Sequence, residues 1–241
     1  MNALWEQPDF RAVAGDAWRP GGLALTRRSL DWCAAHGLLP PTALAVDMGC
    51  GAGATLQLLA ARGLRAVGVD REPAPPGAAV GAGAGFRIRA DVAHPPLAAG
   101  CADIVLLECV LSLLPEPLAA LRAAWAVLKA GGICLMGDVT LRDGALCGDR
   151  KGDSCLSGAR PGDMWGEMLE TADFRILLHE DHSRALAELA ARLCWYGAVA
   201  PGGNDPERHA LGGMCSCETF LPRRRYGYGL WIARKEAVCT P

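Results

Sequence analysis

A glycine-rich turn with an acidic first residue is the segment of the sequence best suited to chemistry. It reads DMGCGAG from Asp47 to Gly53. The apolar run Thr42 to Asp47 predicts a strand before it, and the spacing of apolar residues in Thr55 to Arg62 predicts a helix after it. Glycines in such a turn let the backbone bend tightly and approach a ligand closely. Because they also fit the G-x-G-x-x-A pattern, they do not by themselves separate a dinucleotide from another adenosine cofactor.

Three aspartates, each at the end of a predicted strand, bear on that choice. Asp47, beside the turn, would repel a pyrophosphate but attract the cationic amino acid end of S-adenosylmethionine (SAM). Asp70 ends the second strand and is placed to accept both ribose hydroxyls, while Asp91 follows the third strand and could receive the adenine amino group. Aspartate is also common in turns and caps. Its recurrence at three successive strand ends nevertheless favours a cofactor site, and Asp47 favours SAM over a dinucleotide there.

The elements that position these residues alternate along the chain. After the first strand and helix, short strands are predicted at Leu64 to Asp70 and Phe86 to Asp91, and helical spacing also marks the segment Leu23 to His36. The later pattern predicts strands at Ala102 to Leu107, Ile133 to Asp138, Phe174 to Glu180 and Tyr226 to Arg234, and helices at Leu118 to Lys129, Asp163 to Thr171 and Ser183 to Tyr196. Such alternation predicts a mostly parallel sheet with helices on both faces.

The residues of this alternating region resemble class I SAM-dependent methyltransferases of the ubiquinone and menaquinone biosynthesis type. The resemblance rests on the glycine turn, Gly68 to Asp70, Asp91, and the region Ala102 to Asp138. Within that region, Leu118 to Gly132 is similar to the family's helix and Leu-Lys-Pro-Gly-Gly turn, with Ala130 in place of the proline. The resemblance implies a Rossmann-like, doubly wound, seven-stranded α/β sheet whose last strand is antiparallel, with SAM across the carboxyl ends of the first strands.

The resemblance also implies a role for individual residues around SAM. The methionine part would be held by Asp47, Gly49, Gly51 and Gly53, the ribose by Asp70, the adenine side by Asp91 and Val92, and the edge of the fourth strand by Glu108. Cys50 and Arg71, which adjoin these residues, are included in the expected site. The stretch Pro73 to Gly85 departs from the family, which usually has a helix there.

Cysteines dominate the expected acceptor side of the site. Two long polar loops, 141–162 and 197–222, are expected around the acceptor, and the N-terminal segment 1–40 could cap the cofactor. The candidate acceptor residues are Cys109, Cys147, Cys155, Cys215, Cys217 and Arg19. The alternative is that these cysteines behave as small apolar residues without a role in binding.

One segment of the acceptor side is similar to arsenite methyltransferases. Glu108 to Leu113 resembles their Asn-Cys-Val-Leu-Asn-Leu segment, in which cysteine thiolates hold trivalent arsenic. Glu108 and Ser112 replace the two asparagines, and Cys215 with Cys217 does not have C-x-x-C spacing. No metal site is therefore predicted, and a metalloid acceptor is an alternative to an organic small molecule.

No catalytic residue is assigned with certainty by the sequence. His182 could act as a general base and Asp138 could orient an acceptor, with Cys109 as a third candidate. A lone histidine is more often a capping or surface residue. Methyl transfer also proceeds without a strong base, because the sulfonium supplies a good leaving group and alignment supplies much of the rate.

Composition restricts the class of protein and of partner. The 241 residues are 51% apolar and carry a formal charge of −2, which predicts one α/β domain over residues 1–241 and no broad positive field for nucleic acid. Neither a secretory signal nor an apolar run long enough to span a bilayer is recognisable, so a cytoplasmic location is expected. The expected partner is a small-molecule acceptor.

Two further interpretations differ in class from a methyltransferase. A nicotinamide oxidoreductase would need the same glycine turn and Asp70, but Asp47 disfavours it. A SAM-binding sensor or accessory protein would keep the donor site without transfer activity, and the sequence is compatible with it.

Overall fold

One mixed sheet organises the computed structural model, which describes residues 8–15, 17–73, 85–142, 155–199 and 225–236. The strands are β1 (Leu44–Met48), β2 (Arg65–Asp70), β3 (Phe86–Arg89), β4 (Ala102–Glu108), β5 (Leu128–Leu141), β6 (Arg160–Pro161), β7 (Phe174–Asp181) and β8 (Tyr226–Lys235). Their order is β3-β2-β1-β4-β5-β8-β7, with β6 paired to β5. β8 is antiparallel to both β5 and β7, and β1 to β5 are parallel. This confirms the expected fold class.

The sheet has eight strands where seven were expected. The additional strand, β6, has two residues and pairs with the end of β5 at Thr140 and Leu141. The sequence Arg-Pro carries no alternating pattern, so nothing in the composition predicted it. β5 also begins earlier than expected, at Leu128, because Ala102 of β4 pairs with that residue. Helix α4 consequently ends at Val127 and not at Lys129.

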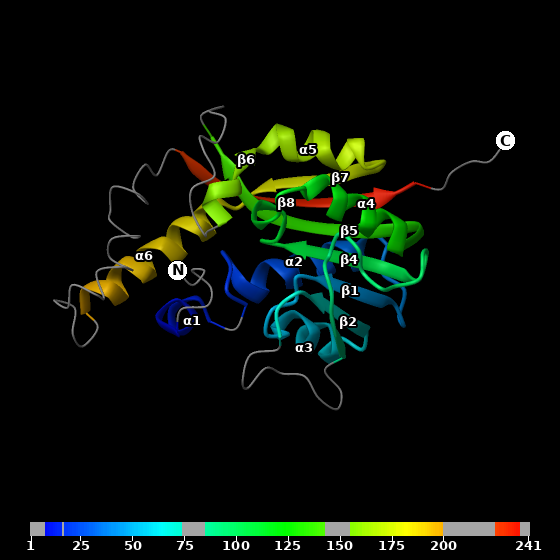
Figure 1. The fold of residues 1–241 in the computed structure, drawn as a ribbon, viewed down its shortest axis with the longest axis horizontal. Coiled ribbons are helices and arrows are strands. Elements are labelled where there is room, and N and C mark those ends of the chain that lie inside the picture. Colours follow the sequence, from blue (N-terminus) through cyan, green and yellow to red (C-terminus); the bar gives the residue numbers. More distant parts are fainter. Residues whose placement is uncertain (1–7, 16, 74–84, 143–154, 200–224, 237–241) are drawn as a thin grey trace.

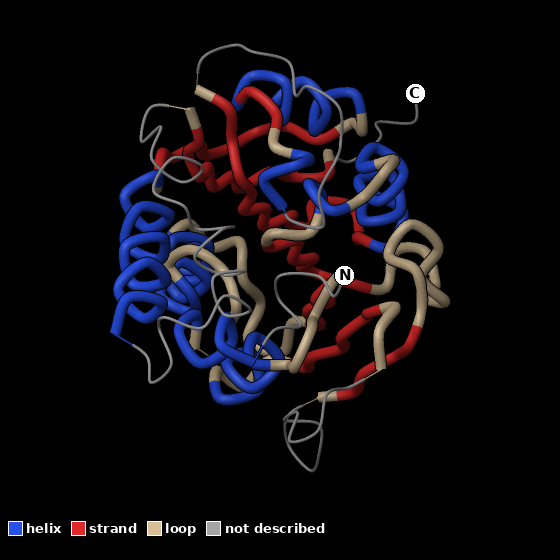
Figure 2. Tube along the Cα trace, turned by 60° about the vertical axis from the view of Figure 1, so that its left-hand side comes forward, coloured by secondary structure: helices blue, strands red, loops and turns tan. Residues whose placement is uncertain are grey.

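Helices cover both faces of the sheet, as Figure 2 shows. They are α1 (Pro8–Ala14), α2 (Gly22–Ala35), α3 (Ala54–Ala61), α4 (Pro117–Val127), α5 (Gly162–Thr171) and α6 (Ser183–Val199), with short 3-10 turns η2 (Leu111–Leu113) and η3 (Cys155–Gly158). The sequence did not predict α1, η2 or η3, which are all too short for periodicity to be recognised.

Alternation along β4 divides the core into two layers. Val105 and Leu107 pack with α4 and α5 on one face, and Ile104 and Leu106 pack with α2 and α3 on the other. All four side chains are fully buried. Because successive residues of a strand point to opposite faces, a central strand with helices on both sides needs apolar residues at successive positions, here Ile104 to Leu107.

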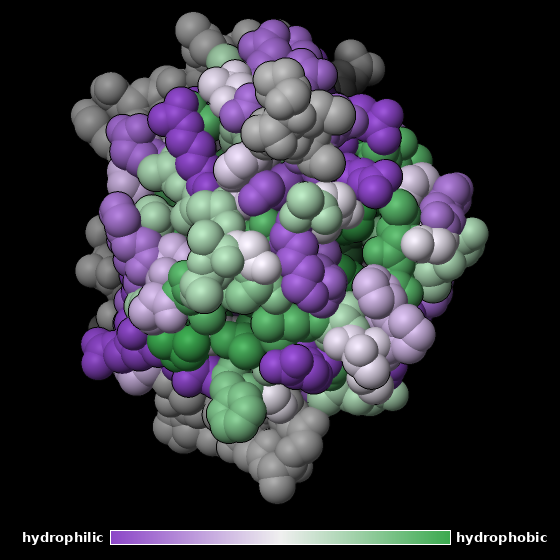
Figure 3. Space-filling model, turned by 90° about the vertical axis from the view of Figure 1, so that its right-hand side faces the viewer, coloured by the Kyte–Doolittle hydropathy of each residue, from purple (hydrophilic) through white to green (hydrophobic). Residues whose placement is uncertain are grey.

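The parallel strands end on one side of the molecule, at the left of Figure 1, towards α1 and α6. The strand register places residues of neighbouring strands at the same level: Asp47 of β1 lies beside Gly68 of β2 and Leu106 of β4. Figure 3 shows the opposite side, where hydrophobic residues gather near the centre between hydrophilic ones. Within the described part of the chain, no helix is both long and apolar enough to cross a bilayer.

The two loops expected at the acceptor are only partly described. Residues 143–154 of the first and 200–222 of the second lie outside the described residues, which leaves Cys147, Cys215 and Cys217 without a structural account. The rest of the first loop is not irregular, since it contains η3, β6 and the start of α5. In the second, α6 continues to Val199.

Candidate functional site

The glycine turn adopts the backbone that its sequence predicts. Gly49, Gly51 and Gly53 have φ angles of 87°, 49° and 87°, which other residues rarely adopt. A Cβ atom at Gly49 would lie 2.3 Å from Val110 Cγ2, so this glycine also permits the residues after β4 to approach the turn. Gly53 precedes α3 as its N-cap residue. The turn therefore brings the ends of β1 and β4 together around one space.

Asp70 is attached to this turn at the end of β2. Its Oδ2 accepts a hydrogen bond of 2.8 Å from the Gly51 amide, and its Oδ1 accepts one of 2.9 Å from the Glu72 amide. Two backbone donors restrain the carboxylate at the carboxyl end of the sheet. This is the placement expected for a group that accepts ribose hydroxyls.

Asp47 is buried at the base of the same space, with 3% of its surface exposed. Burial raises its pKa to about 7, and the negative charges of Glu108 and Asp70 act in the same direction, whereas Arg19 opposes them. Several carboxylates close together with little solvent favour a positively charged ligand. The electrostatics of the turn therefore suit a cationic cofactor.

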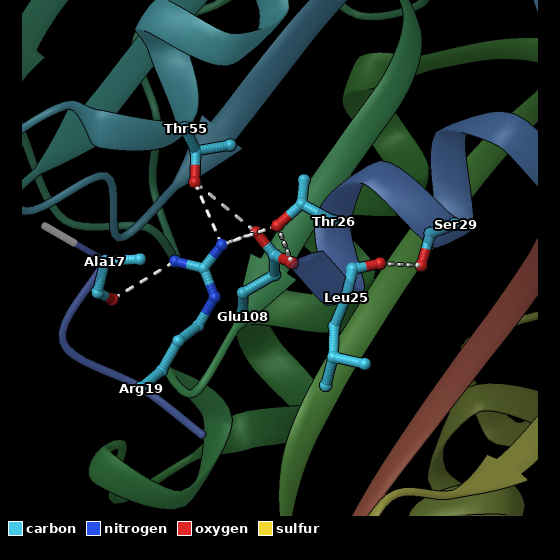
Figure 4. A network of polar contacts seen from close by, with 7 residues as sticks. All are labelled: Ala17, Arg19, Leu25, Thr26, Ser29, Thr55 and Glu108. Carbon is cyan, nitrogen blue, oxygen red and sulfur yellow. Dashed lines mark hydrogen bonds and ion pairs between the residues drawn. The ribbon is translucent and has the colours of Figure 1, made fainter. Parts of the chain in front are cut away.

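Arg19 forms the centre of a buried polar network with Glu108, drawn in Figure 4. Its Nη2 donates to Glu108 Oε2 at 2.7 Å, Thr26 Oγ1 at 2.6 Å and Thr55 Oγ1 at 3.1 Å. Thr26 in turn donates to Glu108 Oε1 at 2.8 Å, and Arg19 Nη1 donates to the Ala17 carbonyl at 3.2 Å. Burial lowers the pKa of Arg19, but Glu108 and other negative groups outweigh it. The sequence placed Arg19 with the acceptor, whereas the structure pairs it with Glu108 of the expected donor site.

A cavity of about 910 Å³ lies over these residues, and this volume is in the range of about 300–1,000 Å³ typical of small-molecule sites. Nine of the ten expected cofactor residues line it: Asp47, Gly49, Cys50, Gly51, Asp70, Arg71, Asp91, Val92 and Glu108. Gly53 does not, because it lies under the turn as the N-cap of α3. The cavity continues past β4 to apolar residues of η2 and to Cys155 of η3.

The segment before α2 covers part of this cavity, and the sequence did not predict its residues individually. Phe10, Arg11 and Trp18 line the cavity together with Arg19. The Trp18 ring lies over the glycine turn, since a Cβ at Gly51 would be 3.7 Å from it, and the Arg11 guanidinium is 4.3 Å from the ring centroid. Thr55, the first polar residue of α3, was missed too. A hydroxyl directly after a glycine turn is a local signal that could have identified it.

Two cysteines of the expected acceptor side meet in the cavity wall. Cys109 follows β4 with a φ of 60°, and its amide donates to the Gly137 carbonyl at 2.6 Å. A hydrogen bond with the Cys155 thiol, together with burial, raises the pKa of Cys109 well above its ordinary value. Both residues are free cysteines. Residues 46 apart in sequence thus form a neighbouring thiol pair.

The remaining catalytic candidates, His182 and Asp138, are not among the residues that line the cavity. His182 Nε2 lies 2.9 Å from Glu180 Oε2, and its amide donates to the Tyr228 carbonyl. Asp138 is fully buried and accepts the amides of Ser112 and Val139, while burial raises its pKa to about 6. His94 lines the cavity instead, next to Asp91. The described residues include no group of three side chains that could hold a metal ion.

Comparisons with known proteins agree with this geometry. Residues 46–136 match the family model described as a methyltransferase domain, a segment that runs from β1 into β5 and contains the glycine turn, Asp70 and Glu108. No curated protein sequence matches the chain. The matched segment includes most of the residues that line the donor side of the cavity.

Solved structures share the fold at low sequence identity. The [4+2]-cyclase SpnF superposes with a TM-score of 0.70 at 21% identity, covering 95% of this chain and 92% of that one. Phosphoethanolamine N-methyltransferase 2 of Haemonchus contortus, in complex with SAM, gives 0.75 at 14% identity; 95% of this chain matches 56% of that chain. Geranyl diphosphate methyltransferase in complex with SAM gives 0.65 at 14%, over 93% and 94%.

The cyclase among these structures shows that the fold alone does not decide the reaction. The match to a methyltransferase domain, in contrast, spans the residues that form most of the donor side of the cavity. Residues 46–136 are thus similar to a methyltransferase domain, and the site formed there is the one that would hold SAM, the methyl donor of such domains.

Proposed function

We propose that this protein transfers a methyl group from SAM to a small, largely apolar molecule held in the second half of the same cavity. The observation that carries the proposal is the continuity of that cavity. Its donor half contains Asp47, Asp70 and Glu108, and its other half contains Val110, Leu113, Leu114 and Cys155. A donor and an acceptor bound in one space can be aligned for direct transfer.

The charges of the donor half fit SAM in position and in sign. The ribose would be held by Asp70, whose carboxylate two backbone amides already orient. Asp47 would attract the cationic amino acid end, and Asp91 and Val92 would border the adenine. Bound SAM supplies a methyl group on a positively charged sulfur with a good leaving group.

The chain's own residues would contribute positioning and exclusion of water. Trp18 and Phe10 cover the cavity, and Arg19 holds Glu108 in a fixed place at the junction of its two halves. A fixed geometry for two reactants lowers the barrier without a strong base. This agrees with the position of His182 away from the cavity lining.

The acceptor half favours an uncharged molecule. Its described lining is formed largely by Val110, Leu113, Leu114 and Pro115. The positive charge of Arg19 near Cys109 is neutralised by Glu108 at 2.7 Å. An anionic acceptor would have to compete with that ion pair and with the neighbouring carboxylates. We therefore expect apolar alcohols or thiols to be better acceptors than carboxylates or phosphates.

This function can be tested with SAM carrying an isotopically labelled methyl group. The purified protein would be incubated with matched acceptors that differ in one group, for example an apolar alcohol and the hydroxy acid of the same chain length. We expect label on the uncharged member of each pair, and much less label with Asp47→Asn when SAM is below saturation. Preference for the anionic members would contradict the proposed acceptor class. Tight SAM binding with no transfer to any class would support a SAM-binding sensor instead.

A second candidate acceptor, a trivalent metalloid such as arsenite, is favoured by the thiol pair. Cys109 and Cys155 are hydrogen-bonded in the wall of the acceptor half. Thiolates are soft ligands that suit a soft element, and two of them on neighbouring elements can bind it together. A nucleophilic arsenic held there would face the donor half of the cavity.

The thiol pair predicts how arsenite methylation would depend on individual cysteines. If arsenite is the acceptor, Cys109→Ser and Cys155→Ser should each abolish methylated arsenic under reducing conditions, while Cys101→Ser should not. Cys101 is a suitable control because it precedes β4 at the opposite end of the strand and does not line the cavity. No arsenic methylation by the parent protein would exclude this acceptor and leave the organic one. Unchanged methylation in the two cavity variants would show that the thiol pair does not hold the arsenic.

A further inference from the structure

A buried arginine lies behind the carboxylate that we assign to the ribose. Arg87 is the second residue of β3, and its register partner on β2 is Gly68. Its side chain is 6% exposed, yet it borders the cavity. Among the described residues, it is the cation within ion-pairing distance of Asp70, with Arg87 Nη2 3.8 Å from Asp70 Oδ1. The sequence analysis assigned this residue no function.

The surroundings of Arg87 connect it to the glycine turn. Gly68 occupies the adjacent position on β2, and a Cβ there would lie 2.6 Å from Cys50 Sγ and 2.7 Å from Leu56 Cδ1. The missing side chain at Gly68 therefore lets Cys50 of the turn pack against β2. Side chains at register partners of neighbouring strands point to the same face of a sheet, so Arg87 extends on the face where Cys50 lies, and its guanidinium interacts with the Cys50 thiol. One guanidinium thereby connects β3 to the glycine turn and to β2.

The contacts of Arg87 are concentrated at one end of its guanidinium. Nη2 donates to the Glu72 carbonyl at 2.7 Å and faces Asp70, whereas the buried Nε has no hydrogen-bond partner among the described residues. A buried cation is costly unless a negative group compensates it. Asp70 is that group, and the Glu72 amide that binds Asp70 Oδ1 belongs to the same residue whose carbonyl binds Arg87. The two side chains therefore share one short segment of backbone.

We infer that Arg87 is the positioning residue of the ribose-binding carboxylate: it acts on the cofactor through Asp70, which it holds in place from the β3 side. The inference rests on the SAM site proposed above and adds a residue to it. Removing Arg87 leaves Asp70 with its two amide contacts but without a neighbouring cation. The carboxylate then has more orientations, and fewer of them accept the ribose hydroxyls.

A double-mutant cycle tests whether Arg87 acts through Asp70. Binding of S-adenosylhomocysteine would be measured by calorimetry for the parent, Arg87→Met, Asp70→Asn and the double variant. We expect Arg87→Met to weaken binding by about tenfold, as is common for groups that orient a binding residue. In the Asp70→Asn background the same substitution should change affinity less than about twofold, because the residue on which it acts is gone. Turnover should show a raised KM for SAM with kcat nearly unchanged.

Controls separate this role from general destabilisation. Arg65→Met removes the same charge from the exposed start of β2 and should leave binding unchanged. Arg87→Lys retains a cation and should recover part of the affinity, which also keeps the test valid if Arg87→Met does not fold. Equal effects of Arg87→Met in both Asp70 backgrounds would show that Arg87 contacts the cofactor directly and overturn the inference, as would an unchanged affinity. Failure of the parent to bind S-adenosylhomocysteine would instead refute the proposed donor site.

Discussion

Asp47→Asn is expected to weaken SAM binding by about 100-fold at pH 8, equivalent to about 2.7 kcal/mol. The substitution keeps the shape of the side chain but removes a charge that is buried beside the glycine turn. Burial, followed by the charge of Glu108, raises the pKa of Asp47 to about 7 in the free protein. The carboxylate is therefore fully charged only above neutrality, where it attracts the cationic cofactor.

The raised pKa of Asp47 also makes the affinity of the parent protein for SAM depend on pH. Below pH 7 the carboxyl binds a proton and loses its attraction for SAM, so affinity should fall by up to about tenfold per pH unit in acid. Above pH 8 the affinity for SAM should be constant. Cofactor binding near pH 7 should release a proton, which calorimetry in buffers of different ionisation enthalpy would detect. Asp47→Asn should abolish both effects.

A matched control for this experiment is Asp31→Asn, which removes an exposed carboxylate of α2 that pairs with Arg62. It should bind SAM as the parent does at every pH.

The raised pKa of Asp47 also predicts an effect on stability. A raised carboxyl pKa means that folding becomes less favourable as pH rises from about 4 to 7. Asp47→Asn should therefore keep or raise the melting temperature at pH 8. Parental affinity in Asp47→Asn, or an unchanged pH profile, would remove Asp47 from the donor site.

The second large effect is expected for the buried ion pair. Arg19→Met should lower the free energy of unfolding by about 3 kcal/mol at pH 8, because it leaves Glu108 without its cation in a site where both side chains are about 90% buried. It also removes hydrogen bonds to Thr26 and Thr55. Urea unfolding followed by circular dichroism would measure the change.

Combining Arg19→Met with Glu108→Gln distinguishes an unpaired charge from lost packing. The double variant should be more stable than Arg19→Met alone, since no charge is then left buried without a partner. Arg184→Met, which breaks the exposed pair of Arg184 with Glu188 on α6, should not change stability measurably. If the double variant is less stable than Arg19→Met, the network stabilises the fold through its hydrogen bonds and not through its charge balance.

Features that depend on neighbouring residues in sequence were predicted well. The glycine turn, Asp47 and Asp70 lie in a strand, a turn and a helix that periodicity and glycine placement indicate directly. Parallel strand ends meet at one edge of a sheet, so the cavity position of Asp91 followed from the same pattern. The cavity position of Glu108 and the antiparallel direction of the last strand followed only through the resemblance to methyltransferases, because a strand sequence does not specify its partners.

Features that depend on packing between distant segments were not predictable. Arg87 is one of two arginines in a four-residue strand, and only the pairing of β3 with β2 brings it to Asp70. Arg19 was expected near the acceptor, and the structure pairs it with Glu108, which lies 89 residues away in the sequence. Trp18 lies over the glycine turn through the path of the segment between α1 and α2. No local pattern in the sequence encodes these three contacts.

The position of β8 has a consequence for biosynthesis. This strand follows β7 in sequence but is inserted between β5 and β7, where it pairs along nine residues of β5 from Ile133 to Leu141. While the ribosome is still synthesising residues before 226, the edges of β5 and β7 have no partner, and unpaired strand edges can associate with other chains. The sheet can be completed only after Tyr226–Lys235 has left the ribosome. Most of the chain is therefore accessible to chaperones before its tertiary structure is complete.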